Sequence, residues 1–128
     1  MKELNFFIVD DDPFFSSLIA KKLNNIGYDK IEVFNTGVEC ILNLKMKPSI
    51  VLLDYQMEKM NGMDILNEIK RIDPSIHVIM VSSQEKVNIA LKLIENGAYS
   101  YIQKSSNDIN QIDEIINRIE NSSILSDN

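Results

Sequence analysis

The sequence predicts a single doubly wound α/β domain, in which five parallel strands form one sheet and five helices cover its two faces. Five short runs of the β type alternate with five helix-type runs along the 128 residues. Several of the β-type runs are apolar at nearly every position, which is the pattern of strands covered on both faces of a parallel sheet. With 45% hydrophobic and 25% charged residues, the composition is that of a globular domain with a hydrophobic core.

The predicted strands are short and end at polar residues or turn signals. The third strand is apolar at every position and stops at Asp54, and the fourth is mostly apolar and stops at Ser82. His77, at the start of the fourth strand, is interpreted as a strand-edge residue rather than a phosphorylated histidine. The five predicted strands are Asn5–Val9, Lys30–Phe34, Ile50–Leu53, His77–Val81 and Tyr99–Ile102.

Capping residues set the boundaries of the first two helices. Asp12 directly precedes Pro13, so Asp12 is predicted to cap the first helix rather than to bind metal. Gly27 ends this helix. The segment Thr36–Glu39 has the spacing of a capping box and opens a second helix, which we expect to run through Leu44.

Three further helices complete the alternation. We expect one over Gly62–Ile72, one that is capped by Ser82–Glu85 and runs to Asn96, and a last one over Asp108–Ile119. The domain then covers residues 1–120, and residues 121–128 form a frayed tail or the start of a linker.

Charge and cysteine content narrow the possible functions. The formal net charge of -6 disfavours sequence-independent binding to nucleic acid or to an anionic membrane. Cys40 is the only cysteine, which excludes an intramolecular disulfide and fits a reducing cytoplasm. Its place in the apolar pattern of the second helix predicts an inert core residue. No run approaches the ~20 apolar residues of a membrane span, and the first apolar run is too short for a signal peptide.

Chemically active side chains follow four of the five predicted strands. Asp10 and Asp11 follow the first strand, Asp54 the third and Ser82 the fourth, and Lys104 comes shortly after the fifth. In a doubly wound fold the carboxyl ends of the strands lie at one edge of the sheet, where function gathers. The sequence therefore predicts that these side chains converge.

The expected charge of this site predicts a bound divalent cation. Three ionised carboxylates beside one ammonium group leave a net charge of about -2, and two unit charges ~4 Å apart repel by about 4 kcal/mol at an effective dielectric near 20. Either one carboxyl group is protonated or a cation fills the gap. An all-oxygen site that handles phosphate suits Mg²⁺. Asp54 can then act as a nucleophile on a phosphoryl group, whose charge Lys104 and the Ser82 hydroxyl would share.

Five segments of the chain resemble receiver domains of two-component response regulators, in their order and at the usual spacing. The resemblance covers nearly the whole chain and implies a flavodoxin-like, CheY-like fold. The segments are Ile8–Pro13, Val51–Asp54, Met60–Gly62, Met80–Ser83 and Gly97–Lys104.

By this resemblance, Asp54 is the aspartate that is phosphorylated. Asp10 and Asp11 are the acidic pair that binds Mg²⁺ together with Asp54, and the backbone carbonyl of Gln56 is a further ligand. The resemblance thus implies that the chain accepts a phosphoryl group in a phosphorelay.

The same resemblance implies a conformational switch. Lys104 is similar to the lysine that binds the phosphoryl group, Ser82 to the switch hydroxyl, and Tyr101 to the aromatic residue that changes rotamer on activation. The chain is then a phospho-acceptor that assists its own phosphorylation and dephosphorylation, and not an enzyme.

The resemblance also implies partners. The donor is a sensor histidine kinase or a histidine phosphotransfer protein. An output partner binds the face formed by the fourth helix, the fifth strand and the fifth helix. The chain is expected to be a monomer or a weak dimer.

Three positions depart from the family pattern. Ser105 stands where many members have a cis-proline after the lysine, and a cis bond before a residue other than proline costs about 2.5–4 kcal/mol. We therefore expect a trans bond between Lys104 and Ser105, with Lys104 still pointing toward Asp54. Glu58 replaces a usual proline, and Tyr99–Ser100 replaces the paired aspartates of DNA-binding subclasses, which argues against a transcription-factor output from this chain.

Two other functions fit parts of the pattern. One is an aspartate-nucleophile phosphohydrolase with Asp10 as nucleophile and Asp12 as acid/base, because an Asp-x-Asp sequence follows an apolar strand. Pro13 after this motif, the lack of room for a cap domain and an unexplained Asp54 count against it. The other is a receiver used only as an interaction scaffold, which ranks lower because every polar position that the chemistry needs is filled.

Overall fold

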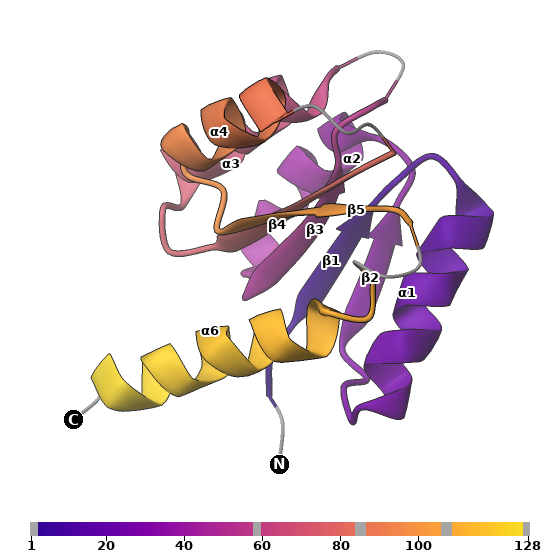
Figure 1. Ribbon diagram of the computed structural model, residues 1–128, viewed down its shortest axis with the longest axis vertical. Helices are drawn as coiled ribbons and strands as arrows, with labels where there is room; N and C mark the ends of the chain where they lie inside the picture. The colour runs from indigo at the N-terminus through magenta and orange to yellow at the C-terminus, as the bar shows by residue number, and fades with distance from the viewer. Residues whose placement is uncertain (1–2, 58–59, 84–86, 106–108, 127–128) are drawn as a thin grey trace.

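A sheet of five parallel strands in the order β2-β1-β3-β4-β5 forms the centre of the computed structural model (Figure 1), which describes residues 3–57, 60–83, 87–105 and 109–126. This arrangement confirms the predicted doubly wound α/β fold. The strands are β1 (Phe6–Val9), β2 (Ile31–Phe34), β3 (Ile50–Asp54), β4 (His77–Ser82) and β5 (Ser100–Gln103).

Three strands extend one residue beyond the predicted ends, and the extra residues, Asp54, Ser82 and Gln103, are all polar. Asp54 pairs with Val81, and Ser82 pairs with Gln103. Ser82, the first residue of the predicted cap Ser82–Glu85, therefore continues the ladder between β4 and β5 and does not cap a helix, whereas Gln84 and Glu85 lie outside the described residues.

Helices cover both faces of the sheet (Figure 1). On one face lie α1 (Pro13–Asn25) and α6 (Ile112–Ser126), and on the other lie α2 (Gly37–Leu42), α3 (Gly62–Ile72) and α4 (Val87–Glu95). Alternate strand residues point to opposite faces, so Ile8 and Leu52 join the first hydrophobic cluster while Val9 and Leu53 join the second. The site residues therefore stand at the ends of strands that are buried on both sides.

None of the helices among the described residues is long and apolar enough to cross a membrane.

The beginning of α1 agrees with its predicted cap. The Asp12 carboxylate accepts hydrogen bonds from the backbone N–H groups of Phe14 (3.0 Å) and Phe15 (3.4 Å), and Pro13 occupies the first turn. Gly27, just after the helix, has a positive φ of 108°, which glycine adopts at little cost.

The second helix is shorter than predicted. Thr36 caps it as expected, but α2 ends at Leu42 and a short 3₁₀ helix, η1 (Leu44–Met46), follows. The Asn43 side chain donates to the carbonyl of Glu39 at 2.7 Å, and such side-chain bonds compete with the continuation of a helix. Cys40, on the inner side of α2, is fully buried, and burial raises the pKa of its thiol to about 12.

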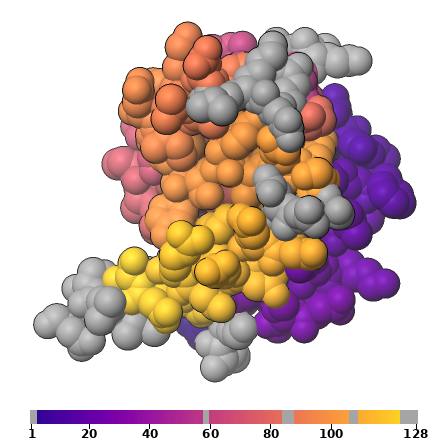
Figure 2. Space-filling view, in the orientation of Figure 1, coloured from indigo at the N-terminus to yellow at the C-terminus, as the bar shows by residue number. Residues whose placement is uncertain are grey.

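The last helix is longer than predicted. It continues to Ser126, seven residues beyond the predicted end at Ile119, so the helix includes residues 121–126 of the predicted tail or linker. Glu120 accepts a hydrogen bond of 2.8 Å from the hydroxyl of buried Tyr28, which ties this part of α6 to the end of α1. Figure 2 shows the yellow surface of α6 along the lower side of the molecule. The predicted first residue of this helix, Asp108, lies outside the described residues.

Candidate functional site

The sheet edge at which the strands end, here called the carboxyl edge, carries two buried carboxylates. Asp10 directly follows β1 and is 2% exposed, and Asp54 ends β3 and is 3% exposed. Both backbones are held by the sheet, since the Asp10 N–H donates to the carbonyl of Phe34 (3.0 Å) and the Tyr55 N–H to that of Val81 (2.8 Å). The sheet therefore fixes the backbone positions from which both carboxylates project.

The two carboxylates are oriented in the same way. In each, Oδ1 accepts a hydrogen bond from the backbone N–H two residues further along the chain, from Asp12 to Asp10 at 2.9 Å and from Gln56 to Asp54 at 3.2 Å. The second oxygens, Oδ2, both face the Lys104 ammonium group, at 2.9 Å from Asp10 and 3.4 Å from Asp54. The bonds to the backbone thus leave one oxygen of each carboxylate directed into the site.

Lys104 reaches this position from the loop after β5. Its backbone N–H donates to the carbonyl of Ser82 at 2.8 Å, which continues the pairing of β4 with β5. The peptide bond from Lys104 to Ser105 is trans, as are the other peptide bonds between described residues. Both parts of the prediction for this loop are therefore confirmed, because the ammonium still points toward Asp54.

The charges of the site act on both titrating groups. Burial and the neighbouring charge of Asp10 raise the pKa of Asp54 to about 6, although the Gln56 N–H and Lys104 oppose this shift. Burial lowers the pKa of Lys104, but its hydrogen bond to Asp10 and the charges of Asp54 and Asp10 outweigh burial and raise it. At Asp54, burial and the second carboxylate together therefore outweigh the stabilisation that the one ammonium group gives to the ionised form.

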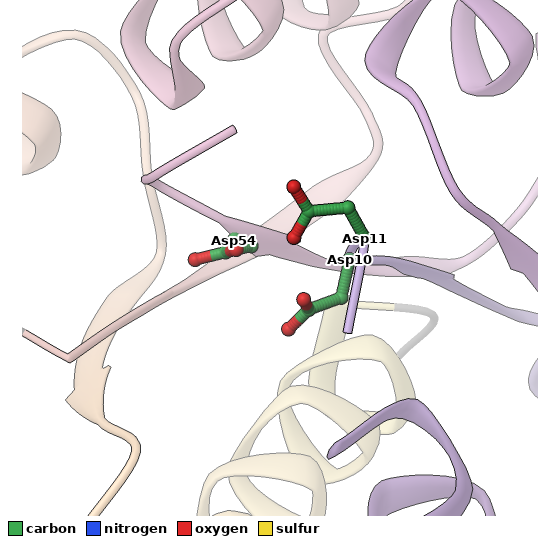
Figure 3. A group of neighbouring side chains, drawn as sticks. All are labelled: Asp10, Asp11 and Asp54. Atoms are coloured by element: carbon green, nitrogen blue, oxygen red, sulfur yellow. The ribbon is translucent and has the colours of Figure 1, made fainter. Parts of the chain in front are cut away.

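Asp11 supplies a third carboxylate. It is exposed, and one oxygen of each of Asp10, Asp11 and Asp54 lies within 4.8 Å of the others. Figure 3 shows Asp10 and Asp11 at the end of β1 beside Asp54 from β3. In an octahedral shell of radius ~2.1 Å, ligand oxygens are about 3–4 Å apart, so small side-chain movements bring this cluster to Mg²⁺ geometry. An all-carboxylate cluster with excess negative charge fits a hard divalent cation.

The remaining predicted site residues lie around this centre. Ser82 is fully buried at the end of β4, and half-buried Tyr101 lies on β5 opposite Met80. The side chain of Gln56 accepts a hydrogen bond from the Ser83 hydroxyl, so the loops after β3 and β4 are joined beside Asp54.

The geometry argues against the phosphohydrolase alternative. An acid/base at Asp12 needs a carboxylate that is free to exchange a proton with substrate. The Asp12 carboxylate instead accepts two backbone N–H groups as the cap of α1, and Asp54 is the buried carboxylate with a raised pKa.

One close contact of the site was not predicted. The Lys104 ammonium lies 4.7 Å from the centroid of the Phe15 ring. Phe15 is in α1 and Lys104 follows β5, so no sequence spacing connects them. The sequence offers one signal: Phe15, Ile19 and Leu23 are apolar at the spacing of one helix face, which indicates core residues and nothing about a charge.

Comparisons of the sequence with known proteins point to one family. The chain matches the response regulator receiver domain family over residues 6–118. The chemotaxis protein CheY of Thermotoga maritima is 33% identical over 98 residues, which are 76% of this chain and 82% of that protein. CheY of Listeria monocytogenes is 30% identical over 118 residues, or 91% of this chain and 96% of that one. In the transcriptional regulatory protein ZraR of Klebsiella oxytoca, 29% identical over 104 residues, the match covers 80% of this chain but 23% of the relative.

Solved structures with the same fold include a response regulator receiver domain protein from Clostridium thermocellum. It has a TM-score of 0.84 at 25% identity, with 96% of this chain and 98% of that chain covered. A CheY-like receiver domain protein from Methanospirillum hungatei has a TM-score of 0.84 at 22% identity, with coverage of 95% and 98%. The second likeness supports the fold alone.

Proposed function

Because this chain belongs to the response regulator receiver domain family of two-component systems, we propose that it accepts a phosphoryl group on Asp54 from a phosphohistidine donor. The donor is a sensor histidine kinase or a histidine phosphotransfer protein, and the site of action is the cytoplasm. Each chain takes up one phosphoryl group and holds it as a signal, so the chain acts as a phospho-acceptor rather than as an enzyme.

The observation that carries this proposal is the orientation of Asp54. Its Oδ1 is engaged by the Gln56 N–H, and its Oδ2 is directed at Lys104 across 3.4 Å. In the transfer, one Asp54 oxygen forms a P–O bond while the P–N bond of the donor breaks, and the electron pair of that bond returns to the donor imidazole. The Lys104 ammonium is placed to stabilise the charge on the phosphoryl oxygens.

Asp10, Asp11 and Asp54, with the backbone carbonyl of Gln56, are the residues that would hold Mg²⁺. When bound, the ion supplies positive charge where the phosphoryl oxygens gather. The cluster of three carboxylates supports this assignment, and so does the raised pKa of Asp54, which burial raises most and the charge of Asp10 raises further.

The proposed switch links the site to an output face. Phosphorylation adds charge that the Ser82 hydroxyl can meet by turning toward Asp54, and Tyr101 then moves toward the space that is vacated. We expect the face of α4, β5 and α6 to bind the output partner. The exposed side chains of Leu91 (57%) and Ile94 (44%) on α4 support this expectation.

Amide hydrogen exchange tests the switch. Phosphorylation of the protein is expected to change the exchange rates of α4 and β5, while the inner strand β1, between β2 and β3, keeps its rates. Unaltered exchange across α4 and β5 in a phosphorylated sample would contradict the switch without affecting the assignment of Asp54.

Incubation with acetyl phosphate and Mg²⁺, followed by intact mass spectrometry, tests the proposed acceptor. The wild-type chain should gain one phosphoryl group, and Asp54→Asn should gain none. Asp64→Asn is a matched control, since Asp64 is an exposed aspartate in the first turn of α3. A gain at the wild-type rate in Asp54→Asn would refute the proposal.

A further inference from the structure

Among the described residues, three groups lie close to the Lys104 ammonium at the carboxyl edge, and one of them carries no charge. Two are the Oδ2 atoms of Asp10 and Asp54, at 2.9 Å and 3.4 Å from the ammonium. The third is the ring of Phe15, whose centroid lies 4.7 Å from the same nitrogen. A cation within ~6 Å of an aromatic ring face is attracted by the ring quadrupole.

Phe15 itself is held firmly. It is 7% exposed and belongs to the hydrophobic cluster between α1, α6 and the sheet. Its backbone N–H donates to the Asp12 carboxylate, and the Asp12 N–H donates to Asp10. Two hydrogen bonds therefore link the Phe15 backbone, through Asp12, to the carboxylate of Asp10 that pairs with Lys104.

The lysine side chain needs such support. Its flexible stem of four carbons ends in a single compact positive charge. The next residue in the chain, Ser105, is exposed. The two carboxylates attract the ammonium, but a stem of this kind can satisfy them in several rotamers. A ring at a third position removes some of these alternatives.

We propose that Phe15 is a positioning residue for Lys104: its ring holds the ammonium between Asp10 and Asp54, where it meets the incoming phosphoryl group. This inference rests on the proposed role of Lys104 in phosphoryl transfer. Phe15 touches neither the phosphoryl group nor the metal, and acts through the lysine alone.

The first test observes the contact in the metal-free protein by NMR. The ε-methylene protons of Lys104 should be shifted upfield by the ring current of Phe15. The shift should disappear in Phe15→Leu and persist in Phe15→Tyr, which keeps the aromatic face. Phe14→Leu makes the same change at the neighbouring residue, which is 79% exposed, and should leave the shift unaltered. An unshifted methylene in wild type, or a shift that survives Phe15→Leu, overturns the proposal.

The second test separates positioning from simple packing by a double-mutant cycle. With acetyl phosphate and Mg²⁺, Phe15→Leu should slow phosphorylation about three- to tenfold, the fold-change expected for one lost cation–π contact. Phe15→Tyr should restore most of the rate. In a Lys104→Met background, Phe15→Leu should have no further effect, because the group through which it acts is gone.

The outcomes distinguish this inference from the proposed function. An equal loss of rate from Phe15→Leu with and without Lys104 would mean that the ring only packs, and would overturn the positioning role. Ile19→Val, a buried change one turn further along α1, should leave the rate unaltered, and a loss as large as that of Phe15→Leu would point to the same conclusion. A wild-type chain that gains no phosphoryl group would instead refute the function of the site, and the positioning role with it.

Discussion

Two half-buried lysines lie at opposite edges of the sheet, and their surroundings differ. Lys104, at the carboxyl edge, faces the carboxylates of Asp10 and Asp54. Lys70, on α3, donates to the backbone carbonyls of Pro74 (3.0 Å) and Ile76 (2.6 Å), just before β4 begins.

The pKa values of these two lysines shift in opposite directions. Burial lowers the pKa of Lys70, and the charge of Asp73 only partly offsets it. The pKa of Lys104 is raised, because its carboxylate neighbours outweigh burial. The comparison teaches that a buried charge alone does not indicate function. Lys70 is satisfied by neutral carbonyls, as in a structural bond, whereas Lys104 belongs to a cluster whose charges do not balance.

The largest expected effect is on the rate of phosphoryl transfer, and it should separate the two lysines. Lys104→Met removes the positive side chain of the site and is expected to slow phosphorylation by acetyl phosphate about 10²- to 10³-fold, the usual loss for one transition-state donor. Lys70→Met should change this rate less than about twofold, because its ammonium is at the other edge. Similar rates for the two variants would contradict the functional role assigned to Lys104.

The metal response is the next effect in size. If Mg²⁺ binds the three carboxylates of the site, a concentration of 100 times its Kd should stabilise the fold by about 2.7 kcal/mol. Thermal unfolding with and without Mg²⁺ measures this response. Asp11→Ala should abolish it, and the exposed-site control Asp64→Ala should keep it in full. The same melting shift in all three proteins would show that Mg²⁺ acts elsewhere.

A smaller effect concerns stability and pH in the metal-free protein. The folded pKa of Asp54 is about 6, above that of a free aspartate. Between about pH 4 and pH 6 the folded chain therefore holds a proton that the unfolded chain has released, and stability falls as the pH rises through this window. In Asp54→Asn the free energy of unfolding should not decrease over this pH range. The variant should therefore be more stable than wild type near pH 7, by about 1–3 kcal/mol.

Denaturant unfolding over this pH range provides the measurement. The free energies of unfolding of wild type and Asp54→Asn should diverge between about pH 4 and pH 6, and Asp64→Asn should follow wild type. Parallel curves for wild type and Asp54→Asn would mean that the carboxyl edge imposes no cost on an ionised Asp54.

The smallest effect belongs to the structural lysine. Lys70→Met leaves the carbonyls of Pro74 and Ile76 without their donor, and is expected to lower the free energy of unfolding by about 1–2 kcal/mol. Urea unfolding at neutral pH would detect this change. A stability equal to that of wild type would mean that water replaces the ammonium at no cost.

The fold and the main residues of the site could be predicted from the sequence for one physical reason. Strands apolar on both faces predict a parallel sheet, and a parallel sheet brings Asp10, Asp54 and Lys104 to one edge although they are far apart in the chain. The caps at Asp12 and Thr36 were also predicted, because capping depends on neighbouring residues.

Two of the features that the sequence did not reveal depend on contacts between distant residues. The continuation of α6 past Ile119 is stabilised where Glu120 meets Tyr28, 92 residues earlier. The place of the Phe15 ring beside Lys104 follows from the packing of α1 on the sheet. The early end of α2 is local, but it depends on which rotamer Asn43 adopts, and the residue type alone does not decide that.

The most direct measurement identifies the residue that carries the phosphoryl group. Borohydride reduces an acyl phosphate to an alcohol, so a phosphorylated aspartate becomes homoserine, which peptide mass spectrometry can assign to a position. After treatment with acetyl phosphate and Mg²⁺, we expect homoserine at position 54 and unmodified aspartate at positions 10 and 11. Homoserine at either of those positions, or none in a protein that has gained a phosphoryl group, would contradict the assignment of Asp54 as the acceptor.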